Sequence, residues 1–376
     1  MSEKSECGPS AAACCCGPGP TDSPPPKAAS LGCVDGEVSA GSATVPRVRS
    51  VLTMADHRGN WASRWGLGRD SHLVPPGLFA LGNPTPESPV LVSANYKLSF
   101  DVLRSSVPGV SAWLLVLDTK GINVWCAAGK GTFGTDELVR QVTDARLGEV
   151  VTHKTLIVPQ LGAPGVDSHA VRKATGFRVR YGPVRAQDIN AFVAANMRAT
   201  PGMRRVMFGT WERVKLIPVE LVHAAKYSVL IGLAFLVLAG LGTDGFAVQR
   251  LLTVGLPSLG FLVMVTLLAS ALVPLLLPIL PGRMFALKGA WVGLLSAGLA
   301  TAIAMASPEL KAQWLGLVAW WLILPAVASF IAMNFTGAST FTSLSGVRKE
   351  MRRFVPLQAI AAGLGVVLWI AGRFVG

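Results

Sequence analysis

The sequence predicts an α/β domain followed by a transmembrane domain of five helices. Short apolar runs alternate with helical patterns in the first half of the chain, which is typical of an α/β layer around a largely parallel sheet. Five longer apolar runs, each near the ~20 residues that cross a bilayer, lie at 225–243, 254–278, 287–306, 314–333 and 355–374. With 51% hydrophobic residues, the 376-residue chain is too apolar for a purely soluble protein.

An N-terminal tail over residues 1–48 is predicted to be disordered, because its composition of Pro, Gly, Ser and Ala cannot bury a core. No signal peptide is expected, since the acidic segment Met1–Cys7 is followed by no apolar stretch. Five of the six cysteines lie in this tail, namely Cys7, Cys14, Cys15, Cys16 and Cys33. Their spacing matches neither an iron–sulfur quartet nor paired zinc ligands, so no iron–sulfur cluster is expected in this chain. The run Cys14–Cys16 is open to two interpretations, a soft-metal trap or a reduced linker tract.

A soluble domain is predicted over residues 49–215, beginning with an irregular arm at 49–88 that is rich in turn residues. Strands are expected at 90–93, 97–103, 112–117, 122–126, 155–158, 177–181 and 204–208. Helices are expected at 135–147, 168–174 and 186–197. About 130 residues suffice for one such domain, and the transmembrane domain then covers 216–376.

Lysine and arginine residues predict how the spans are oriented. Cations gather before the first span, after the second and after the fourth, at Arg204, Arg205, Arg213, Lys215, Lys226, Arg283, Lys288, Arg348, Lys349, Arg352 and Arg353. The opposite flanks hold only Arg250, Lys311 and Arg373. By the positive-inside rule we expect a multi-pass protein of the cytoplasmic (inner) membrane, with a cytoplasmic soluble domain and the C-terminus on the opposite side. Topology and contact with the anionic lipid bilayer then explain the net charge of +13, and no nucleic acid is expected as a partner.

A glycine-rich turn of Gly129, Gly131 and Gly134 fits the pattern G-x-G-x-x-G between an expected strand and an expected helix. That context is the one a dinucleotide-binding turn requires. However, Asp136 and Glu137 stand in the first turn of the following helix, where they repel a pyrophosphate. The pattern therefore keeps nucleotide binding as an alternative without favouring it.

Cys126 is the single cysteine after residue 34, and it lies near the carboxyl end of an expected strand, where an α/β sheet presents ligands. A free cysteine at a strand end is commonly a small buried hydrophobe. If Ala127–Gly131 forms a helical turn, its amides and Lys130 favour the thiolate, which makes Cys126 a candidate metal ligand or nucleophile. A nucleophile needs a base, and none of the five histidines has a spacing that identifies one. On these grounds the role of Cys126 stays open.

Several stretches together resemble a known family. NVWCAAGK at 123–130 resembles the cap-helix motif of the HgcA family, the membrane-anchored corrinoid proteins of mercury methylation. Further stretches similar to that family are GNPTPESPVLVSANYKLSFDVLR at 82–104, VPQLGAPGV at 158–166, YGPVRAQDI at 181–189 and NFTGASTFTSLSGVRKEM at 334–351. The resemblance runs from about residue 60 to the end, and several stretches also resemble the corrinoid iron–sulfur proteins of acetyl-CoA metabolism.

The resemblance implies a Rossmann-like corrinoid-binding domain, in which Cys126 is the lower axial ligand of cobalt in a cobalamin-type cofactor. It also implies that the cap beneath the corrin ring consists of Asn123, Val124, Trp125, Cys126, Ala127, Ala128, Gly129 and Lys130. Small residues suit such a cap, because a backbone that carries Ala and Gly can approach a flat macrocycle closely. Trp125 is equally well explained as a core residue. Gly162 and Gly165 follow another strand on the same edge of the sheet and are expected to line the cofactor.

The activity that the resemblance implies is that of a cobalamin-dependent methyltransferase, which transfers a methyl group to Hg(II) to form methylmercury. Since Hg(II) is an electrophile, the methyl group must arrive as a carbanion or radical equivalent. A thiolate at Cys126 favours this transfer by donating electron density to cobalt, as haem thiolates do to iron. A methyltetrahydrofolate-linked donor is implied as the methyl source, and a ferredoxin-like iron–sulfur protein, HgcB, as the electron source and carrier of Hg(II).

A second class of function remains open, a membrane protein with a nucleotide-binding regulatory or transport domain. The expected spans hold no firmly embedded charge, which disfavours an ion-coupled transporter. The hydroxyl-rich stretch 336–350 after the fourth span is open between a contact surface and a basic loop at the membrane surface. An absorption spectrum separates the two classes, because a corrinoid protein is coloured.

Overall fold

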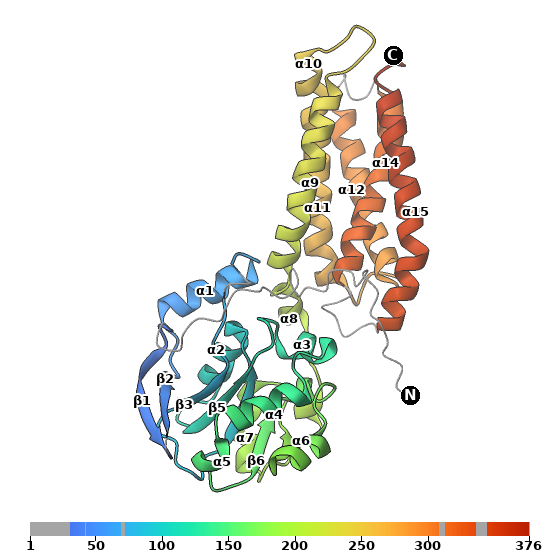
Figure 1. The fold of residues 1–376 in the computed structure, drawn as a ribbon. Helices are drawn as coiled ribbons and strands as arrows, with labels where there is room; N and C mark the ends of the chain where they lie inside the picture. The colour runs from blue at the N-terminus through green and yellow to red at the C-terminus, as the bar shows by residue number, and fades with distance from the viewer. Residues whose placement is uncertain (1–30, 42, 69–71, 308–312, 336–343, 376) are drawn as a thin grey trace. The chain divides into compact units, whose positions relative to one another are not determined.

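The computed structural model describes residues 31–41, 43–68, 72–307, 313–335 and 344–375. The chain forms two compact units and passes from one to the other between Val206 and Met207. The first unit is an α/β structure and the second is helical (Figure 1). Most of the predicted tail, with every cysteine of that tail except Cys33, lies outside the described residues, and so does the greater part of 336–350.

A seven-stranded mixed sheet forms the centre of the α/β unit, in the order β1-β2-β3-β5-β4-β6-β7. Its strands are β1 (Val34–Ala40), β2 (Ala43–Val48), β3 (Gly77–Leu81), β4 (Val90–Ala94), β5 (Ala112–Leu117), β6 (Thr155–Val158) and β7 (Arg178–Tyr181). The pairs β5 with β4, β4 with β6, and β6 with β7 are parallel. β3 lies antiparallel to β5, and β1 antiparallel to β2. An α/β domain is thus confirmed, but the sheet is mixed and its continuous parallel part is limited to the four strands from β5 to β7.

The carboxyl ends of the four parallel strands lie along one edge of the sheet. After β4 the chain adds β5 on one side and then crosses back to add β6 on the other side of β4. In open α/β sheets, ligands bind outside the carboxyl ends of the strands at such a reversal of strand order. We call this side of the unit the carboxyl edge, and it is formed by the segments that directly follow β4, β5, β6 and β7.

Helices cover both faces of the parallel strands (Figure 1). The helices of this unit are α1 (Met54–Arg64), α2 (Lys97–Ser106), α3 (Val124–Lys130), α4 (Thr135–Asp144), α5 (Leu147–Val150), α6 (Ser168–Thr175) and α7 (Ile189–Ala194). Leu115 of β5 belongs to the apolar cluster on the side of α4 and α6, together with Leu138. Its neighbour Leu114 belongs to the cluster on the side of α2 and α7, together with Phe100. Successive strand residues point to opposite layers, so β5 is apolar along its whole length.

Most of the predicted elements of this unit are present, and three are wrong. The strands expected at 90–93, 112–117, 155–158 and 177–181 are confirmed as β4 to β7, and the three expected helices as α4, α6 and α7. The run 97–103 is helix α2 and not a strand. Its helical pattern could not be recognised in the sequence, because charged residues that are buried in ion pairs occupy positions where a buried helix side usually has apolar residues. The run 122–126 lies in a loop and in α3, and 204–208 contains no strand.

The segment before β3 is more regular than its composition suggests. Residues 34–40 and 43–48, which the composition assigns to a disordered tail, form the antiparallel strands β1 and β2, and Cys33 next to them is fully buried. The arm at 49–88, expected to be irregular, contains helix α1 and strand β3. These two strands gain their order from pairing with β3, since β2 and β3 are parallel neighbours far apart in the chain. Composition cannot reveal such a non-local pairing.

The second unit contains five helices that are long and apolar enough to cross a membrane. These candidate spans are Thr210–Ala239, Val248–Leu276, Phe285–Met305, Trp314–Asn334 and Gly346–Ala371. Their principal helices are α9 (Ile217–Ala239), α11 (Leu256–Leu276), α12 (Phe285–Met305), α14 (Trp314–Asn334) and α15 (Leu344–Ala371), and α8 (Thr210–Val214) precedes the first. The five predicted spans are confirmed by length and composition, whereas the cytoplasmic location of the first unit remains a prediction.

Four charged residues within these candidate spans are buried, so the expectation of spans without embedded charge is wrong. They are Arg213, Glu220, Lys288 and Glu350. Lys288 of α12 donates hydrogen bonds to the carbonyl oxygens of Leu277 and Leu280 just beyond α11, the latter over 2.8 Å. Glu350 of α15 accepts a hydrogen bond from the backbone N–H of Ala286 over 2.5 Å. The side chains of Lys288 and Glu350 are thus hydrogen-bonded at helix ends, each with the sign of charge that the helix dipole favours there.

Candidate functional site at the carboxyl edge

Helix α3 lies at the carboxyl edge, in the connection from β5 to α4. Asn123 caps its N-terminus, because the side-chain oxygen accepts a hydrogen bond from the backbone N–H of Cys126 over 3.0 Å. Gly131 ends the helix with φ of 81°, a left-handed conformation that glycine adopts without strain. An asparagine before the helix and a glycine after it are strong local signals. They hold a helix of only two turns in place.

Cys126 lies in the first turn of α3 and is half-buried. The strand expected up to Cys126 is wrong, because the Asn123 cap starts the helix at Val124. The helical conformation considered from Ala127 is present up to Lys130. Cys126 takes part in a disulfide bond in this structure, whereas Cys33 is a free thiol. Metal ligation by Cys126 therefore requires that the disulfide is first reduced to the thiolate.

The two sides of α3 differ in what surrounds them. Ala127 and Ala128 are buried and attach the helix to the domain, whereas Gly129 and Lys130 are exposed. A Cβ atom added to Gly129 would meet no other atom within 4 Å. Residues 126 and 129 are three apart and therefore share one side of the helix. The backbone beside Cys126 is thus open to a broad ligand.

Trp125 occupies the same short helix but does not belong to the core. Its side chain is 40% exposed, so the interpretation as a core residue does not hold. Val124 is half-buried and packs against the apolar cluster that contains Leu115. The predicted cap residues 123–130 are therefore one continuous structural element, as the resemblance implies, and their role toward a cofactor is a separate question.

Gly162 and Gly165 lie in the segment that follows β6, and the structure brings both next to α3 and the turn after it. A Cβ atom on Gly165 would collide with the carbonyl oxygen of Phe133 and lie 3.1 Å from the Cα of Ala128. A Cβ atom on Gly162 would collide with the ring of Phe133. Glycine is therefore required at these positions for close packing alone. Their predicted contact with a cofactor remains a prediction.

A buried polar network, which the sequence pattern did not reveal, holds the loop that leads into α3. Asn95 follows β4 and is only 2% exposed. Its side-chain oxygen accepts hydrogen bonds from the backbone N–H of Thr119 at 3.1 Å, from the Thr119 hydroxyl at 2.8 Å and from the backbone N–H of Gly121 at 3.0 Å. The Thr119 hydroxyl is also 2.7 Å from the carbonyl oxygen of Ile122, next to the cap residue Asn123. The sequence could have indicated Asn95, because a polar residue directly after a buried strand lies where an α/β sheet presents its functional side chains.

Acidic residues at the same edge support the loop rather than a ligand. Glu137 of α4 accepts a hydrogen bond from the backbone N–H of Asp118 over 2.7 Å and pairs with Arg140 at 2.6 Å. Burial tends to raise the pKa of Asp118, but hydrogen bonds and the charge of Lys120 lower it overall.

Gly129 lies inside a helix and not in a strand-to-helix turn, so Gly129, Gly131 and Gly134 lack the geometry of a dinucleotide-binding turn.

His153 and His169 offer no evident base for Cys126, and His153 lies at the amino ends of β4 and β6, the opposite edge of the sheet. In His153, Nε2 lies 2.9 Å from the carbonyl oxygen of Ser88 and Nδ1 accepts a hydrogen bond from the backbone N–H of Thr155. His169 is an exposed residue of α6. Within the described ranges, no group of three or more His, Cys, Asp or Glu residues is arranged to hold a metal ion. A single soft ligand suits an ion already held by a macrocycle better than a bare ion, which needs several protein ligands.

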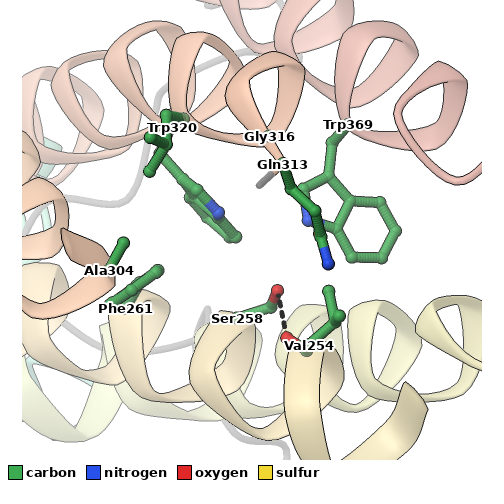
Figure 2. Close-up of a pocket in the computed structure, with 9 residues that line it drawn as sticks. Val254, Ser258, Phe261, Ala304, Gln313, Gly316, Trp320 and Trp369 are labelled. Atoms are coloured by element: carbon green, nitrogen blue, oxygen red, sulfur yellow. Dashed lines mark hydrogen bonds between the residues drawn. The ribbon is translucent and has the colours of Figure 1, made fainter. Parts of the chain in front are cut away.

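The second unit, which we call the membrane unit because it holds the five candidate spans, contains cavities that are too small for a substrate. One of about 10 Å³ is lined by Val254, Ser258, Phe261, Ala304, Gln313, Gly316, Leu317, Trp320 and Trp369 (Figure 2). Ser258 does not aim a free hydroxyl at it, since that group donates to the carbonyl oxygen of Val254 over 2.8 Å. A second cavity of about 10 Å³ lies beside Glu220 and Ser270. Such a volume admits about one water molecule.

Part of the α/β unit is similar to known proteins. A family model described as CO dehydrogenase/acetyl-CoA synthase delta subunit matches residues 69–193. This stretch contains β3 to β7, the Asn95 network and the whole of α3, and it excludes α1 and the five candidate spans. The similarity therefore covers the carboxyl edge and not the membrane unit.

The relatives found are subunits of one kind of complex. The acetyl-CoA decarbonylase/synthase complex subunit gamma of Archaeoglobus fulgidus is 30% identical over 125 residues, which cover 33% of this chain and 26% of the relative. The corresponding subunit of Methanopyrus kandleri is 28% identical over 127 residues, covering 33% and 27%. Subunit gamma 2 of Methanosarcina mazei is 33% identical over 99 residues, covering 25% and 21%. This chain thus spans about a quarter of the length of these relatives, and it shares with them a segment and not the whole protein.

Proposed function

We propose that this chain is a membrane-bound corrinoid protein of the HgcA type that transfers a methyl group to Hg(II), with the reduced thiolate of Cys126 as the lower axial ligand of cobalt. One observation carries the proposal. A capped two-turn helix at the carboxyl edge presents one soft donor, Cys126, beside the open backbone at Gly129. The similarity of residues 69–193 to acetyl-CoA decarbonylase/synthase subunits, and the resemblance of NVWCAAGK to the HgcA cap helix, support it.

The residues of α3 fit a planar macrocycle. A ring that receives its axial ligand from a helix must come close to the backbone around that ligand, so bulky neighbours on the same side of the helix exclude it. Gly129 leaves this space free, and Ala127 and Ala128 keep the helix seated by burying their small side chains. Trp125 and Lys130 stand at the exposed flanks, where they can contact the ring or its substituents.

A bound corrinoid would supply the methyl-transfer chemistry, and the residues of α3 would hold it. The thiolate of Cys126 would hold the corrinoid through its metal ion and would donate electron density to it, as cysteine ligands do to haem iron. Hg(II), the substrate, accepts the methyl group together with bonding electrons, and a strongly donating ligand favours transfer in that sense. Asn123 and Asn95 are positioning residues, because one caps the helix that carries the sulfur and the other holds the loop before it.

The proposal includes two further components. A ferredoxin-like iron–sulfur protein of the HgcB type supplies electrons and delivers Hg(II), and a methyltetrahydrofolate-linked donor supplies the methyl group. That the relatives are named as subunits of a complex supports a protein partner. A cytoplasmic location of the α/β unit is part of the same proposal, because reducing conditions there keep Cys126 as a thiol.

The test uses the full chain, purified without oxygen, treated with dithiothreitol and loaded with hydroxocobalamin. Wild type, Cys126→Ala and Cys33→Ala are compared by absorption spectrum after removal of free corrinoid, and by methylmercury formation with a chemical reductant and a methyl donor. Cys33→Ala is the matched control, because Cys33 is the other described cysteine and lies in the core. We expect Cys126→Ala to shift the spectrum and abolish methylmercury formation, and Cys33→Ala to change neither.

Two results contradict the proposal. An unchanged corrinoid spectrum in Cys126→Ala shows that sulfur does not bind cobalt, and near-normal methylmercury formation in that variant shows that the thiolate is not needed. A protein that retains no corrinoid but binds NAD or ATP supports the alternative, a membrane protein with a nucleotide-binding regulatory or transport domain.

A further inference from the structure

Helix α1 turns its polar side inward and its apolar side outward. Asp56, Asn60 and Ser63 are buried on one side of the helix. On the opposite side, Met54 and Trp61 are seven residues apart, about two helical turns, and therefore aligned. The exposed apolar side chains of α1 and its flanks, which we call the α1 face, are Val51 (74% exposed), Met54 (69%), Trp61 (62%) and Leu67 (58%). A soluble surface helix shows the reverse pattern.

Buried ion pairs explain why α1 keeps this orientation. Asp56 lies 2.8 Å from Lys97 and 3.0 Å from Arg104, both of them buried residues of α2. Asp101 of α2 completes the group, at 2.7 Å from Lys97 and 2.8 Å from Arg104. Rotating α1 so that its apolar side is buried would separate Asp56 from Lys97 and Arg104. Buried charges would then lack a partner, which is strongly destabilising. The outward direction of the α1 face is therefore built into the fold.

Helix α1 packs beside α2, which begins at the carboxyl edge, and the exit of the chain toward the second unit is anchored at the same edge. Lys97, the partner of Asp56, follows the carboxyl end of β4 by three residues. Near the exit, Met203 accepts a hydrogen bond from the backbone N–H of Val184, shortly after β7. Arg204 donates to the side chain of Gln160, shortly after β6. Both anchor points of the exit segment thus belong to the carboxyl edge.

The connection to the first candidate span is short. Thr210, where that span begins, is four positions after Val206, and four extended residues reach at most about 14 Å. A short connection keeps the α/β unit close to the bilayer that the spans cross, which raises the effective concentration of lipid at that unit. A short tether therefore brings a lipid surface within reach of an apolar face on the α/β unit.

We infer that the α1 face binds the surface of the lipid bilayer that the chain itself spans, and that α1 is an interfacial helix. Its composition fits this partner, since Trp61 is an aromatic residue of the kind enriched at membrane interfaces. Arg58 is exposed between Met54 and Trp61, and Arg64 lies at the end of the helix. Cations beside apolar residues favour a surface that contains anionic lipid. This inference depends on exposure, charge and tether length, and it holds whether or not the unit binds a corrinoid.

The test measures the fluorescence of Trp61 in the full chain reconstituted into lipid nanodiscs. Subtracting the spectrum of Trp61→Phe from that of wild type isolates the Trp61 signal. We expect phospholipids brominated near the headgroup to remove most of this signal and aqueous acrylamide to remove little of it. Adding phosphatidylserine to phosphatidylcholine discs should strengthen the quenching by brominated lipid. Trp314, 62% exposed at the start of a candidate span, supplies a lipid-contacting reference through Trp314→Phe.

A charged variant and a matched control complete the design. Met54→Glu should reverse the pattern, so that Trp61 becomes accessible to acrylamide and escapes the brominated lipid. Val102→Glu places the same charge at an exposed apolar residue of α2, outside the α1 face, and should change nothing. Quenching of wild-type Trp61 by acrylamide but not by brominated lipid overturns the inference. So does shielding from both quenchers, because that result means that protein and not lipid covers the α1 face.

Discussion

The side-chain oxygen of Asn123 accepts a hydrogen bond from the backbone N–H of Cys126 over 3.0 Å, so the residue that starts helix α3 also holds the proposed cobalt ligand in its first turn. Cap and ligand are three residues apart, which is the spacing at which an N-cap side chain reaches the helix backbone. The sulfur thus depends on the cap for its position.

Replacing Asn123 by Ala removes this cap. We expect a loss of about 0.5–2 kcal/mol of local stability, seen as faster hydrogen exchange at the amides of residues 126–128. Corrinoid loading should fall in parallel, because the thiolate no longer has one fixed position. Asn123→Asp keeps the capping oxygen and serves as the control. Equal exchange rates in wild type and Asn123→Ala would contradict the positioning role.

Gly129→Leu separates cofactor binding from folding. Because a side chain at Gly129 meets no atom within 4 Å, the variant should fold, and leucine should strengthen the helix by about 0.8 kcal/mol relative to glycine. The leucine occupies the space beside Cys126, so retained corrinoid should drop severalfold, with Gly129→Ala intermediate. Absorbance after gel filtration measures the loading. Full loading of Gly129→Leu means that no ring lies against this side of α3.

Asn95→Ala tests the network behind the site. The change leaves the buried N–H groups of Thr119 and Gly121 without their acceptor, which costs about 1–3 kcal/mol for an unsatisfied group. We expect the segment 118–123 to exchange its amide protons faster, while the amides of β6 stay protected. Thr119→Ser keeps the hydroxyl and should resemble wild type. Unchanged protection of the segment in Asn95→Ala would show that the network does not position α3.

The ion pairs beneath α1 predict acid sensitivity of the α/β unit. Burial alone would raise the pKa of Asp56, but hydrogen bonds from Lys97 and Thr53 lower it below the ordinary value. A lowered pKa contributes stability that is complete above the unfolded value of about 3.9 and is lost as the pH falls toward the folded value. Wild type should therefore unfold increasingly below about pH 4.

Asp56→Asn supplies the comparison for this acid effect. It leaves the charges of Lys97 and Arg104 with one partner fewer, so we expect the variant to be less stable at neutral pH by about 3–5 kcal/mol and less sensitive to acid. Cys33 reports the unfolding, since it is fully buried and burial raises the pKa of its thiol. Pulsed alkylation of Cys33, read by mass spectrometry, gives the unfolded fraction at each pH. Parallel pH curves for the two proteins would remove Asp56 as the cause.

The comparison of sequence and structure shows where pattern arguments succeed. The strands β4, β5 and β6 are almost wholly buried and appear as continuous apolar runs, so their places could be predicted. The edge strand β7 alternates exposed arginines with half-buried Val179 and Tyr181, and this period of two also predicts a strand. The five spans are apolar along their length, and their number and approximate limits follow from that alone. In both groups, the apolar residues that identify the element are neighbours in the sequence.

Helices α1 and α2 show where such arguments fail. Lys97, Asp101 and Arg104 point into the interior of the unit, and Met54 and Trp61 point out of it. The apolar pattern of these segments therefore does not mark their buried sides. Only pairing of charges between the two helices makes this arrangement stable, and those partners are about 40 residues apart in the chain. Strands β1 and β2 were missed for a similar reason, since their stabilising neighbour β3 comes almost 30 residues later.

The sequence by itself determined the division into an α/β unit and five candidate spans, and it singled out Cys126 with its flanking Asn, Ala and Gly residues. These properties depend on local apolarity and on residue types within a few positions of each other. Only the tertiary structure decided that Cys126 belongs to a capped helix at the carboxyl edge, that Asn95 holds the loop before it, and that α1 turns its apolar side outward. The physical reason is that hydrogen bonds and ion pairs between distant segments set which side of each element is buried.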